Sequence, residues 1–352
     1  MSDKNTLRHW LRPGADIIGP HIESFLRNTG GPAHIEIPGR DTSRCRVLVT
    51  LLHGNETSGI KALHELLHRE TRPAVTMHCF ILATRAALLE PLFTHRQVPG
   101  QPDLNRCFRA PGEADPVSRS HEFHLAQTVW ERIQALQPEA VVDMHNTSGE
   151  GPSFAVTTTL ASRHEPIVSL FTQRLIVTDL KLGALMEQDS AQLPVVTVEC
   201  GGAFEETADR IALEGLERYF TNNDIRRCPP TDWPLDVYRH PMRMEITHSI
   251  RLAYGESPRV GADLTLKADI EHHNFGSVTP DTPLGWANPD ALGGLGVYDA
   301  RRRNHLTRLY RIVDGMLYPV QRQKLFMITS NPAIAASDCL WYTVIEDPAD
   351  GS

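Results

Sequence analysis

Short runs of apolar residues alternate with longer amphipathic stretches between about residues 44 and 199, and this alternation constrains the fold most. The apolar runs are typical of buried strands: CRVLVTLL (45–52), MHCFILAT (77–84), EAVVDMH (139–145) and LPVVTVEC (193–200). The amphipathic stretches have the apolar spacing of helices: IKALHELLHRE (60–70), HEFHLAQTVWERIQAL (121–136) and FEETADRIALEGLERYF (204–220). Because strands and helices alternate along the chain, the sequence predicts an α/β fold in which helices flank a mixed sheet.

The pattern changes after the proline-rich segment CPPTDWP (228–234). The rest of the chain is a series of short alternating segments typical of strands: MRMEITHSIRLAY, DLTLKADI, RLYRIVDGMLYPV, KLFMITS and CLWYTVIED. We therefore expect an α/β domain over residues 1–230 and a smaller, β-rich domain over residues 231–352.

Charge and cysteine usage narrow the classes of partner. The chain has 35 Lys and Arg against 43 Asp and Glu, a net charge of −8, which disfavours nucleic acid and anionic membranes as partners. The six cysteines are scattered without a Cys-x-x-Cys pair, and the sequence has neither a signal peptide nor a long apolar run. We expect a cytoplasmic protein with a small-molecule substrate, and leave open whether it forms a homo-oligomer.

Residues that can bind a metal stand where the predicted strands end. His53 follows the first strand, His145 ends the third and Glu199 is the one acidic residue of LPVVTVEC. Ligands of α/β sheets gather at the carboxyl ends of strands, so these side chains are expected on one rim. A catalytic zinc ion takes about three His or carboxylate ligands and keeps a position for water. We predict that His53, Glu56 and His145 hold one Zn²⁺ per chain and that Glu199 is the catalytic base.

Further polar residues fit around such a site. Asp143 or Asn146 could orient an imidazole from behind. Asn105 and Arg106, in the segment DLNRCF, pair an amide with a guanidinium, which suits a substrate carboxylate. The alternative for Arg106 is a salt bridge to an acidic residue near the core.

A second motif competes for the metal. The segment His64-Glu65-Leu66-Leu67-His68 matches the zincin signature HExxH. Packing of its leucines on the sheet would leave His64 and His68 on or near the solvated side of the helix. We therefore favour His53 over His64 as the ligand of the catalytic zinc.

Four ordered segments resemble a known family. LLHGNETSG, DLNRCF, VVDMHNTSG and VTVECGG are similar to the signature segments of the succinylglutamate desuccinylase/aspartoacylase family, relatives of the zinc carboxypeptidases. The resemblance implies zinc ligands at His53, Glu56 and His145 and a general base at Glu199, and it implies that Asn105 and Arg106 bind the substrate carboxylate. It also implies an arginine that stabilises the oxyanion. The nearest one here is Arg96, seven residues before Asp103, where family members have it five residues before.

The resemblance and the residues together predict a zinc-dependent hydrolase that cleaves the amide bond of an N-acyl amino acid or a similar small amide with a carboxylate. Zinc would activate the attacking water and Glu199 would take its proton. Ala83-Thr84-Arg85 replaces an Asn-Pro of the family, which bears on substrate identity. Two alternatives stay open: a zinc carboxypeptidase that acts on peptides, and a metal-binding or ligand-sensing protein without turnover.

Overall fold

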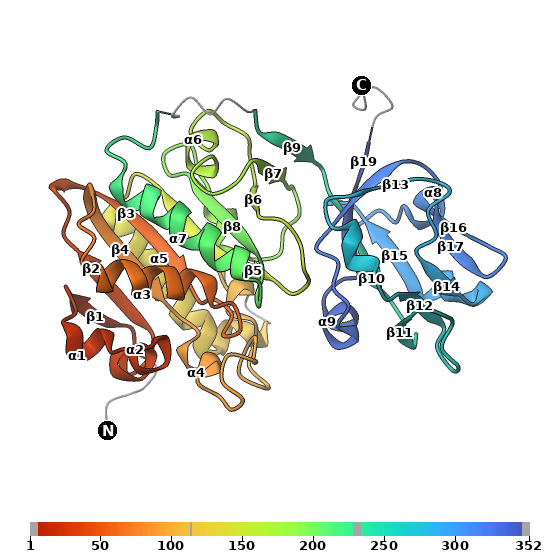
Figure 1. The fold of residues 1–352 in the computed structure, drawn as a ribbon, viewed down its shortest axis with the longest axis horizontal. Helices are drawn as coiled ribbons and strands as arrows, with labels where there is room; N and C mark the ends of the chain where they lie inside the picture. Colours follow the sequence, from red (N-terminus) through yellow and green to blue (C-terminus); the bar gives the residue numbers. More distant parts are fainter. Residues whose placement is uncertain (1–5, 113–114, 228–233, 249, 347–352) are drawn as a thin grey trace. The chain divides into compact units, whose positions relative to one another are not determined.

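The computed structural model describes residues 6–112, 115–227, 234–248 and 250–346. The chain divides into two compact units (Figure 1). The first comprises Met1–Asn146, Ser153–Ile176 and Lys181–Val237, and the second comprises Thr147–Pro152, Val177–Leu180 and Tyr238–Ser352. The boundary that the sequence suggests, residue 230, lies outside the described residues, so the division there stays a proposal.

A nine-stranded sheet forms the centre of the first unit (Figure 1). Parallel pairs such as β3 with β5 and antiparallel pairs such as β2 with β4 make it a mixed sheet. In spatial order its strands are β1 (Arg8–Leu11), β2 (Ala33–Ile37), β4 (Val75–Ile81), β3 (Asp41–Thr50), β5 (Val141–Thr147), β8 (Val195–Gly202), β6 (Phe154–Thr157), β7 (Arg174–Val177) and β9 (Asp236–Arg239).

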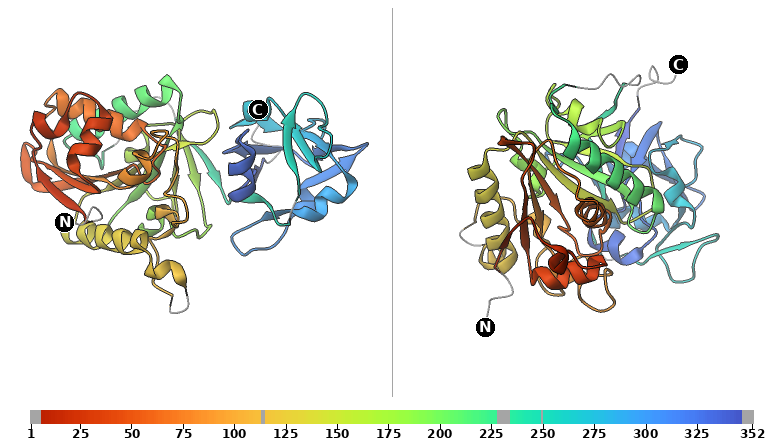
Figure 2. Two further views of the ribbon diagram at one scale, coloured as in Figure 1. Left: turned by 90° about the horizontal axis from the view of Figure 1, so that it is seen from below. Right: turned by 60° about the vertical axis from the view of Figure 1, so that its left-hand side comes forward.

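Helices lie on both faces of this sheet (Figures 1 and 2). They are α1 (Ala15–Ile18), α2 (Ile22–Thr29), α3 (Ser58–His68), α4 (Thr84–Ala87), α5 (His121–Leu136), α6 (Glu165–Val168) and α7 (Glu206–Thr221). Short 3-10 turns cover Leu104–Arg106, Pro116–Arg119 and Leu185–Gln188. The predicted α/β class with helices flanking a mixed sheet is confirmed.

The alternation of side chains along β3 assigns the helices to the two faces. Val47 and Val49 pack in one apolar cluster with Val129 and Ile133 of α5. On the other face α3 approaches so closely that a Cβ on Gly59 would lie 2.3 Å from the hydroxyl of Thr50. Successive residues of a strand point to opposite faces, so β3 is buried on both of its faces, which explains its continuous apolar run.

The second unit contains two five-stranded sheets (Figure 1). The first has the order β13 (Ser277–Val278), β18 (Gln323–Phe326), β19 (Trp341–Ile345), β10 (Met242–Ile246) and β15 (Leu295–Tyr298). The second has the order β11 (Leu252–Gly255), β12 (Leu264–Lys267), β14 (Gly285–Ala287), β17 (Met316–Pro319) and β16 (Tyr310–Val313). Its helical segments are α8 (Leu306–Leu309), α9 (Pro332–Ser337) and the 3-10 turns Ile270–His273 and Pro289–Gly294. The β-rich character predicted for this part of the chain is confirmed.

Two features of the fold differ from the sequence expectations. The elements before residue 41, namely β1, α1, α2 and β2, are absent from the prediction. His145 and Glu199 lie inside β5 and β8, two and three residues before the strands end, whereas the sequence placed them at the ends.

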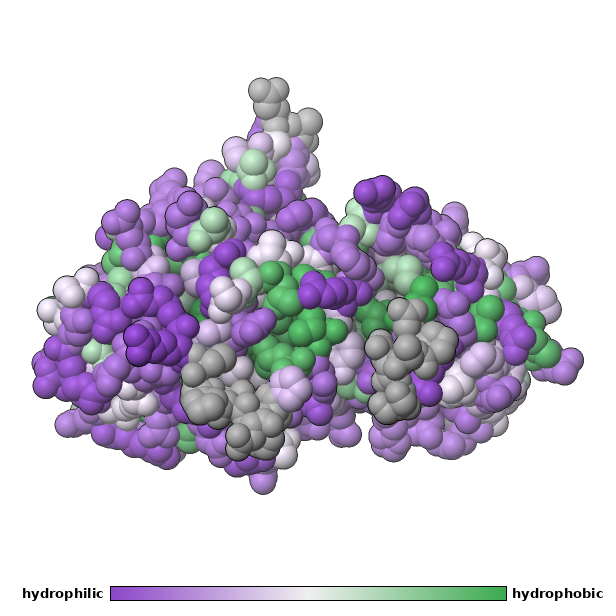
Figure 3. Space-filling model, turned by 90° about the horizontal axis from the view of Figure 1, so that it is seen from above, coloured by the Kyte–Doolittle hydropathy of each residue, from purple (hydrophilic) through white to green (hydrophobic). Residues whose placement is uncertain are grey.

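None of the helices in the described part of the chain has the length and apolar character that a membrane span requires. Hydrophilic side chains cover most of the face in Figure 3, and hydrophobic ones gather in a limited part of it.

Candidate metal and catalytic site

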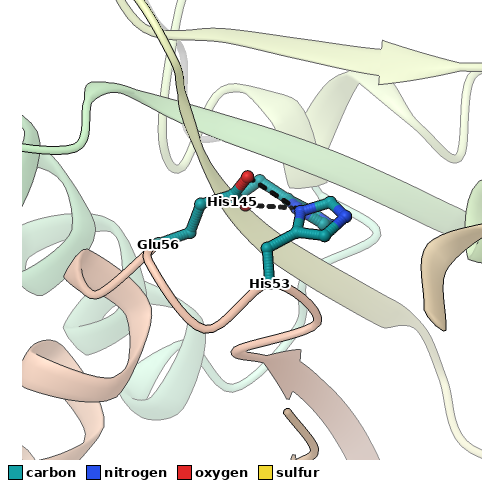
Figure 4. A group of neighbouring side chains, drawn as sticks. All are labelled: His53, Glu56 and His145. Atoms are coloured by element: carbon teal, nitrogen blue, oxygen red, sulfur yellow. Dashed lines mark hydrogen bonds and ion pairs between the residues drawn. The ribbon is translucent and has the colours of Figure 1, made fainter. Parts of the chain in front are cut away.

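Three side chains predicted as metal ligands meet in the first unit (Figure 4). His53 and Glu56 lie in the loop between β3 and α3, and His145 lies on β5, the parallel neighbour of β3. Glu56 bridges the two imidazoles: its Oε1 is 2.8 Å from Nδ1 of His53, and its Oε2 is 2.7 Å from Nδ1 of His145. One donor atom from each residue lies within 4.8 Å of the others, and all three residues are buried.

The outer nitrogen of each imidazole contacts a second carboxylate. Asp143, fully buried on β5, lies 2.9 Å from Nε2 of His145. Asp103, at the start of a 3-10 turn, lies 3.0 Å from Nε2 of His53. A carboxylate behind a histidine fixes the proton on the outer nitrogen and directs the lone pair of the inner one at a metal.

The sequence identified only one of the two carboxylates that contact the outer nitrogens of the histidines. Asp143, one of two candidates for this role, occupies the expected position. The side chain of Asn146, the other candidate, instead bonds Ser58 and the carbonyl of Gly201. Asp103 had no predicted role, although it is the first residue of the DLNRCF segment, and that position was the available signal.

These residues fit a divalent ion. Two neutral nitrogens and one carboxylate oxygen, converging from a buried loop and a strand, form the donor set of catalytic zinc sites. The charges support the same assignment: burial lowers the pKa of His145, but the carboxylates of Asp143 and Glu56 outweigh it and raise that pKa well above its ordinary value. A metal ion bound by His145 would displace this proton, because a histidine ligand must be deprotonated.

Glu199 lies beside these ligands on β8 and is 9% exposed. Its Oε2 is buried and has no hydrogen-bond partner among the residues that the structure describes. Burial raises the pKa of Glu199 to about 7, and the negative charge of Glu56 contributes in the same direction. A buried acid with one unpaired oxygen and a near-neutral pKa can exchange protons at neutral pH.

Arg96 places a positive charge next to the ligands. Its guanidinium lies 3.0 Å from Asp103 and 3.3 Å from Oε1 of Glu56. The structure therefore brings Arg96 to the predicted metal ligands despite its altered spacing in the sequence.

Asn105 and Arg106 differ in how their side chains are engaged. The side-chain oxygen of the buried Asn105 accepts a hydrogen bond from the amide of Leu185 at 3.0 Å. The guanidinium of Arg106 donates to the carbonyl of Asn105 at 3.0 Å, and no acidic residue in the described ranges forms an ion pair with it. The alternative, a structural salt bridge between Arg106 and an acidic residue, is therefore not found within those ranges.

The competing HExxH motif corrects one expectation. His64, predicted on or near the solvated side of α3, is only 8% exposed, whereas His68 is exposed. The Nε2 atom of His64 bonds the carbonyl of Gly19, because α1 and α2 pack against α3. Neither histidine belongs to the cluster of His53, Glu56 and His145.

Comparisons with known proteins agree with this architecture. Residues 46–218 match the model of the succinylglutamate desuccinylase/aspartoacylase catalytic domain. No curated protein sequence matches the chain.

Solved structures of the same fold come from bacteria and a mammal. Succinylglutamate desuccinylase from Vibrio cholerae is 14% identical, with a TM-score of 0.55 over 88% of this chain and 84% of that protein. The Chromobacterium violaceum succinylglutamate desuccinylase is 13% identical, with a TM-score of 0.53 over 90% and 89% of the two chains. Murine aminoacylase 3 is 15% identical, with a TM-score of 0.51 over 87% and 96%. Over residues 46–218, this chain belongs to the succinylglutamate desuccinylase/aspartoacylase family of deacylases.

Proposed function

We propose that this protein is a cytoplasmic, zinc-dependent amidohydrolase that cleaves the amide bond of an N-acyl amino acid or a similar small amide with a carboxylate. The observation that carries the proposal is the convergence of His53, Glu56 and His145 near Glu199, whose buried Oε2 has no hydrogen-bond partner among the described residues. A purely structural zinc site is closed by four ligands and has no use for an adjacent base.

His53, Glu56 and His145 would hold one zinc ion, and Asp103 and Asp143 would keep both Nδ1 lone pairs directed at it. When bound, zinc supplies Lewis acidity that activates water and polarises the amide carbonyl.

Glu199 is assigned the proton transfers. In its ionised form it accepts a proton from the attacking water, and its raised pKa makes the protonated form accessible at neutral pH. The protonated carboxyl then donates to the departing amine nitrogen. Oε2 of Glu199 has no hydrogen-bond partner within the described chain, so it is available both to accept the proton of water and to donate it to the amine.

The two arginines are assigned to bind negative charge: Arg96 at the oxyanion and Arg106 at the substrate carboxylate. Arg96, held by Asp103 and Glu56, would stabilise the oxygen that becomes negative as the carbonyl is attacked. Arg106, together with Asn105, would bind the carboxylate of the amino-acid part. Because no acidic residue in the described ranges forms an ion pair with Arg106, its guanidinium can bind a substrate carboxylate in bidentate fashion without first losing such a partner.

Glu199→Gln tests the proposal most directly. The variant should bind zinc with unchanged stoichiometry and lose about 10²- to 10⁴-fold in kcat, the usual contribution of a general base. Glu217→Gln, a half-exposed carboxylate on α7 that lies 3.9 Å from Arg69, is the control and should keep full activity. Full activity of Glu199→Gln towards every hydrolysed amide would remove Glu199 from the mechanism.

A substrate panel separates the deacylase from a carboxypeptidase. N-acetyl, N-succinyl and longer N-acyl amino acids are compared with dipeptides and tripeptides, with and without a chelator. Higher kcat/KM for the acyl amino acids supports the proposal, and a preference for peptides would replace it with the carboxypeptidase.

A further inference from the structure

The histidines of the HExxH segment lie close together on α3 although the proposed active site does not use them. His64 and His68 are four residues apart on an 11-residue helix, so their side chains share one face. Their Nε2 atoms are 3.2 Å apart, and the ring planes meet at 80°. A carbonyl from another segment, that of Gly19 at the end of α1, points at both nitrogens.

The three atoms form a nearly regular triangle. The Gly19 oxygen lies 3.1 Å from Nε2 of His64 and 2.9 Å from Nε2 of His68. Ligands bound about 2.1 Å from a transition metal are about 3.0 to 3.4 Å apart in octahedral or tetrahedral geometry. We propose that His64, His68 and the carbonyl of Gly19 form a second metal site, separate from the catalytic one.

Hydrogen bonds alone do not satisfy all three contacts. If both nitrogens carry protons, both donate to the Gly19 oxygen, and the two nitrogens then stand 3.2 Å apart with no hydrogen bond between them. If only one carries a proton, the bare nitrogen has no hydrogen to share with the carbonyl oxygen. An ion near the centre of the triangle uses two nitrogen lone pairs and one oxygen lone pair at once.

The surroundings suit an ion that solvent can reach. His64 is buried beside the ring of Phe25, 5.7 Å between centroids, which holds the imidazole in place. Burial lowers the pKa of His64, which favours its neutral form. His68 is exposed and lines a pocket of about 580 Å³ with Ile18 and Leu67, which leaves room for water as the remaining ligand.

The donor set selects the class of metal. Two imidazole nitrogens and one peptide oxygen suit Zn²⁺, Ni²⁺, Co²⁺ or Cu²⁺, and they disfavour Mg²⁺ and Ca²⁺, which prefer all-oxygen sites. Glu65, the base of a zincin motif, is instead paired with Arg69 at 2.7 Å on the exposed side of the helix. The site would therefore link the end of α1 to α3, with the glutamate of the motif held by Arg69.

Metal stoichiometry tests the site. The full-length protein is stripped with chelator, dialysed against excess Zn²⁺ and analysed for bound metal. Wild type should bind two ions per chain, and His64→Ala and His68→Ala should each bind one and keep amide hydrolysis. Glu65→Gln, which changes the same motif without removing a ligand, should bind two. His53→Ala should lose the other ion and keep this one, so failure of either site can be recognised.

Hydrogen exchange gives a second measurement that does not depend on activity. Filling the second site should slow exchange of the backbone amides of residues 15–29 in wild type and in His53→Ala, but not in His68→Ala. Because His68 is exposed, its replacement should leave the fold intact. An unchanged ion count in His68→Ala, or a single ion in wild type that His53→Ala abolishes, would overturn the proposal.

Discussion

Replacing Asp143 by asparagine tests whether the metal site depends on the carboxylates behind its histidines. Asp143 is fully buried, lies 2.9 Å from Nε2 of His145 and accepts a weaker bond from Thr197 at 3.4 Å through the same oxygen. The amide of the introduced asparagine can keep an oxygen at this position. Its NH₂ group then replaces the other carboxylate oxygen, which has no partner among the described residues. The substitution therefore keeps the shape and removes the charge.

The size of the effect follows from that charge. Loss of an outer carboxylate typically weakens metal binding 10- to 100-fold, which corresponds to about 1.4 to 2.8 kcal/mol. We expect the Kd for Zn²⁺ to rise by this factor in Asp143→Asn, as measured by competition with a chromophoric chelator at fixed pH. Activity at saturating zinc should recover in large part, because the ligands themselves are unchanged.

The chain offers a matched control for this experiment. Asp189 is also buried and lies 2.8 Å from Nε2 of His164, but this pair is not part of the metal cluster. Asp189→Asn should reduce stability without changing the affinity of folded protein for zinc. Wild-type affinity in Asp143→Asn, or an equal loss in Asp189→Asn, would show that the carboxylate behind His145 does not strengthen metal binding.

Three further predictions address substrate, metal and acid stability. Arg106→Ala should lower kcat/KM for acyl amino acids about 10- to 100-fold, because a charged hydrogen bond contributes about 1.5 to 3 kcal/mol, and an amide analogue without the carboxylate should show no such loss. His53→Ala should lose the catalytic ion and turnover, measured by metal analysis and amide hydrolysis; retained turnover would exclude His53 as a ligand. Burial lowers the pKa of His34 to about 3, so below pH 6.5 the unfolded chain binds a proton that the folded chain does not. The unfolding free energy should then fall by up to about 2 kcal/mol between pH 6.5 and 5, and urea titrations of His34→Gln should show a smaller fall.

The sequence predicted the central strands and helices well because their patterns are strong. The helix over 121–136 follows the cap residue Ser120 and has the bounds expected. β2 escaped prediction, although Ala33 and Ile35 are fully buried, because His34 and Glu36 interrupt its apolar pattern. His34 is buried next to His78, a pairing between distant residues that no local pattern reveals.

The sequence predicted the site residues that lie on recognisable strands. It did not predict the residues that reach the site from separate loops. His145 and Glu199 lie on adjacent strands, so their proximity follows from the strand order. Asp103 reaches His53 from a separate loop, and Gly19 reaches His64 from the end of α1. Contacts of this kind depend on tertiary packing, which the spacing of residues in the sequence does not encode.

Strand order explains how one loop and two strands can build a site for both metal and proton. β3, β5 and β8 are consecutive in the sheet, so the loop after β3 lies over β5, and β5 lies beside β8. Glu56 in that loop accepts from the backbone amide of Asn146 at 3.3 Å as well as from His145, which anchors the loop to β5. β5 in turn is bound to β8 where the side chain of Asn146 donates to the carbonyl of Gly201, two residues beyond Glu199. The proposed metal ligands and the proposed base are thus connected through backbone groups of adjacent strands. A substitution in this chain of contacts should therefore displace Glu199 relative to the metal as well as weaken metal binding.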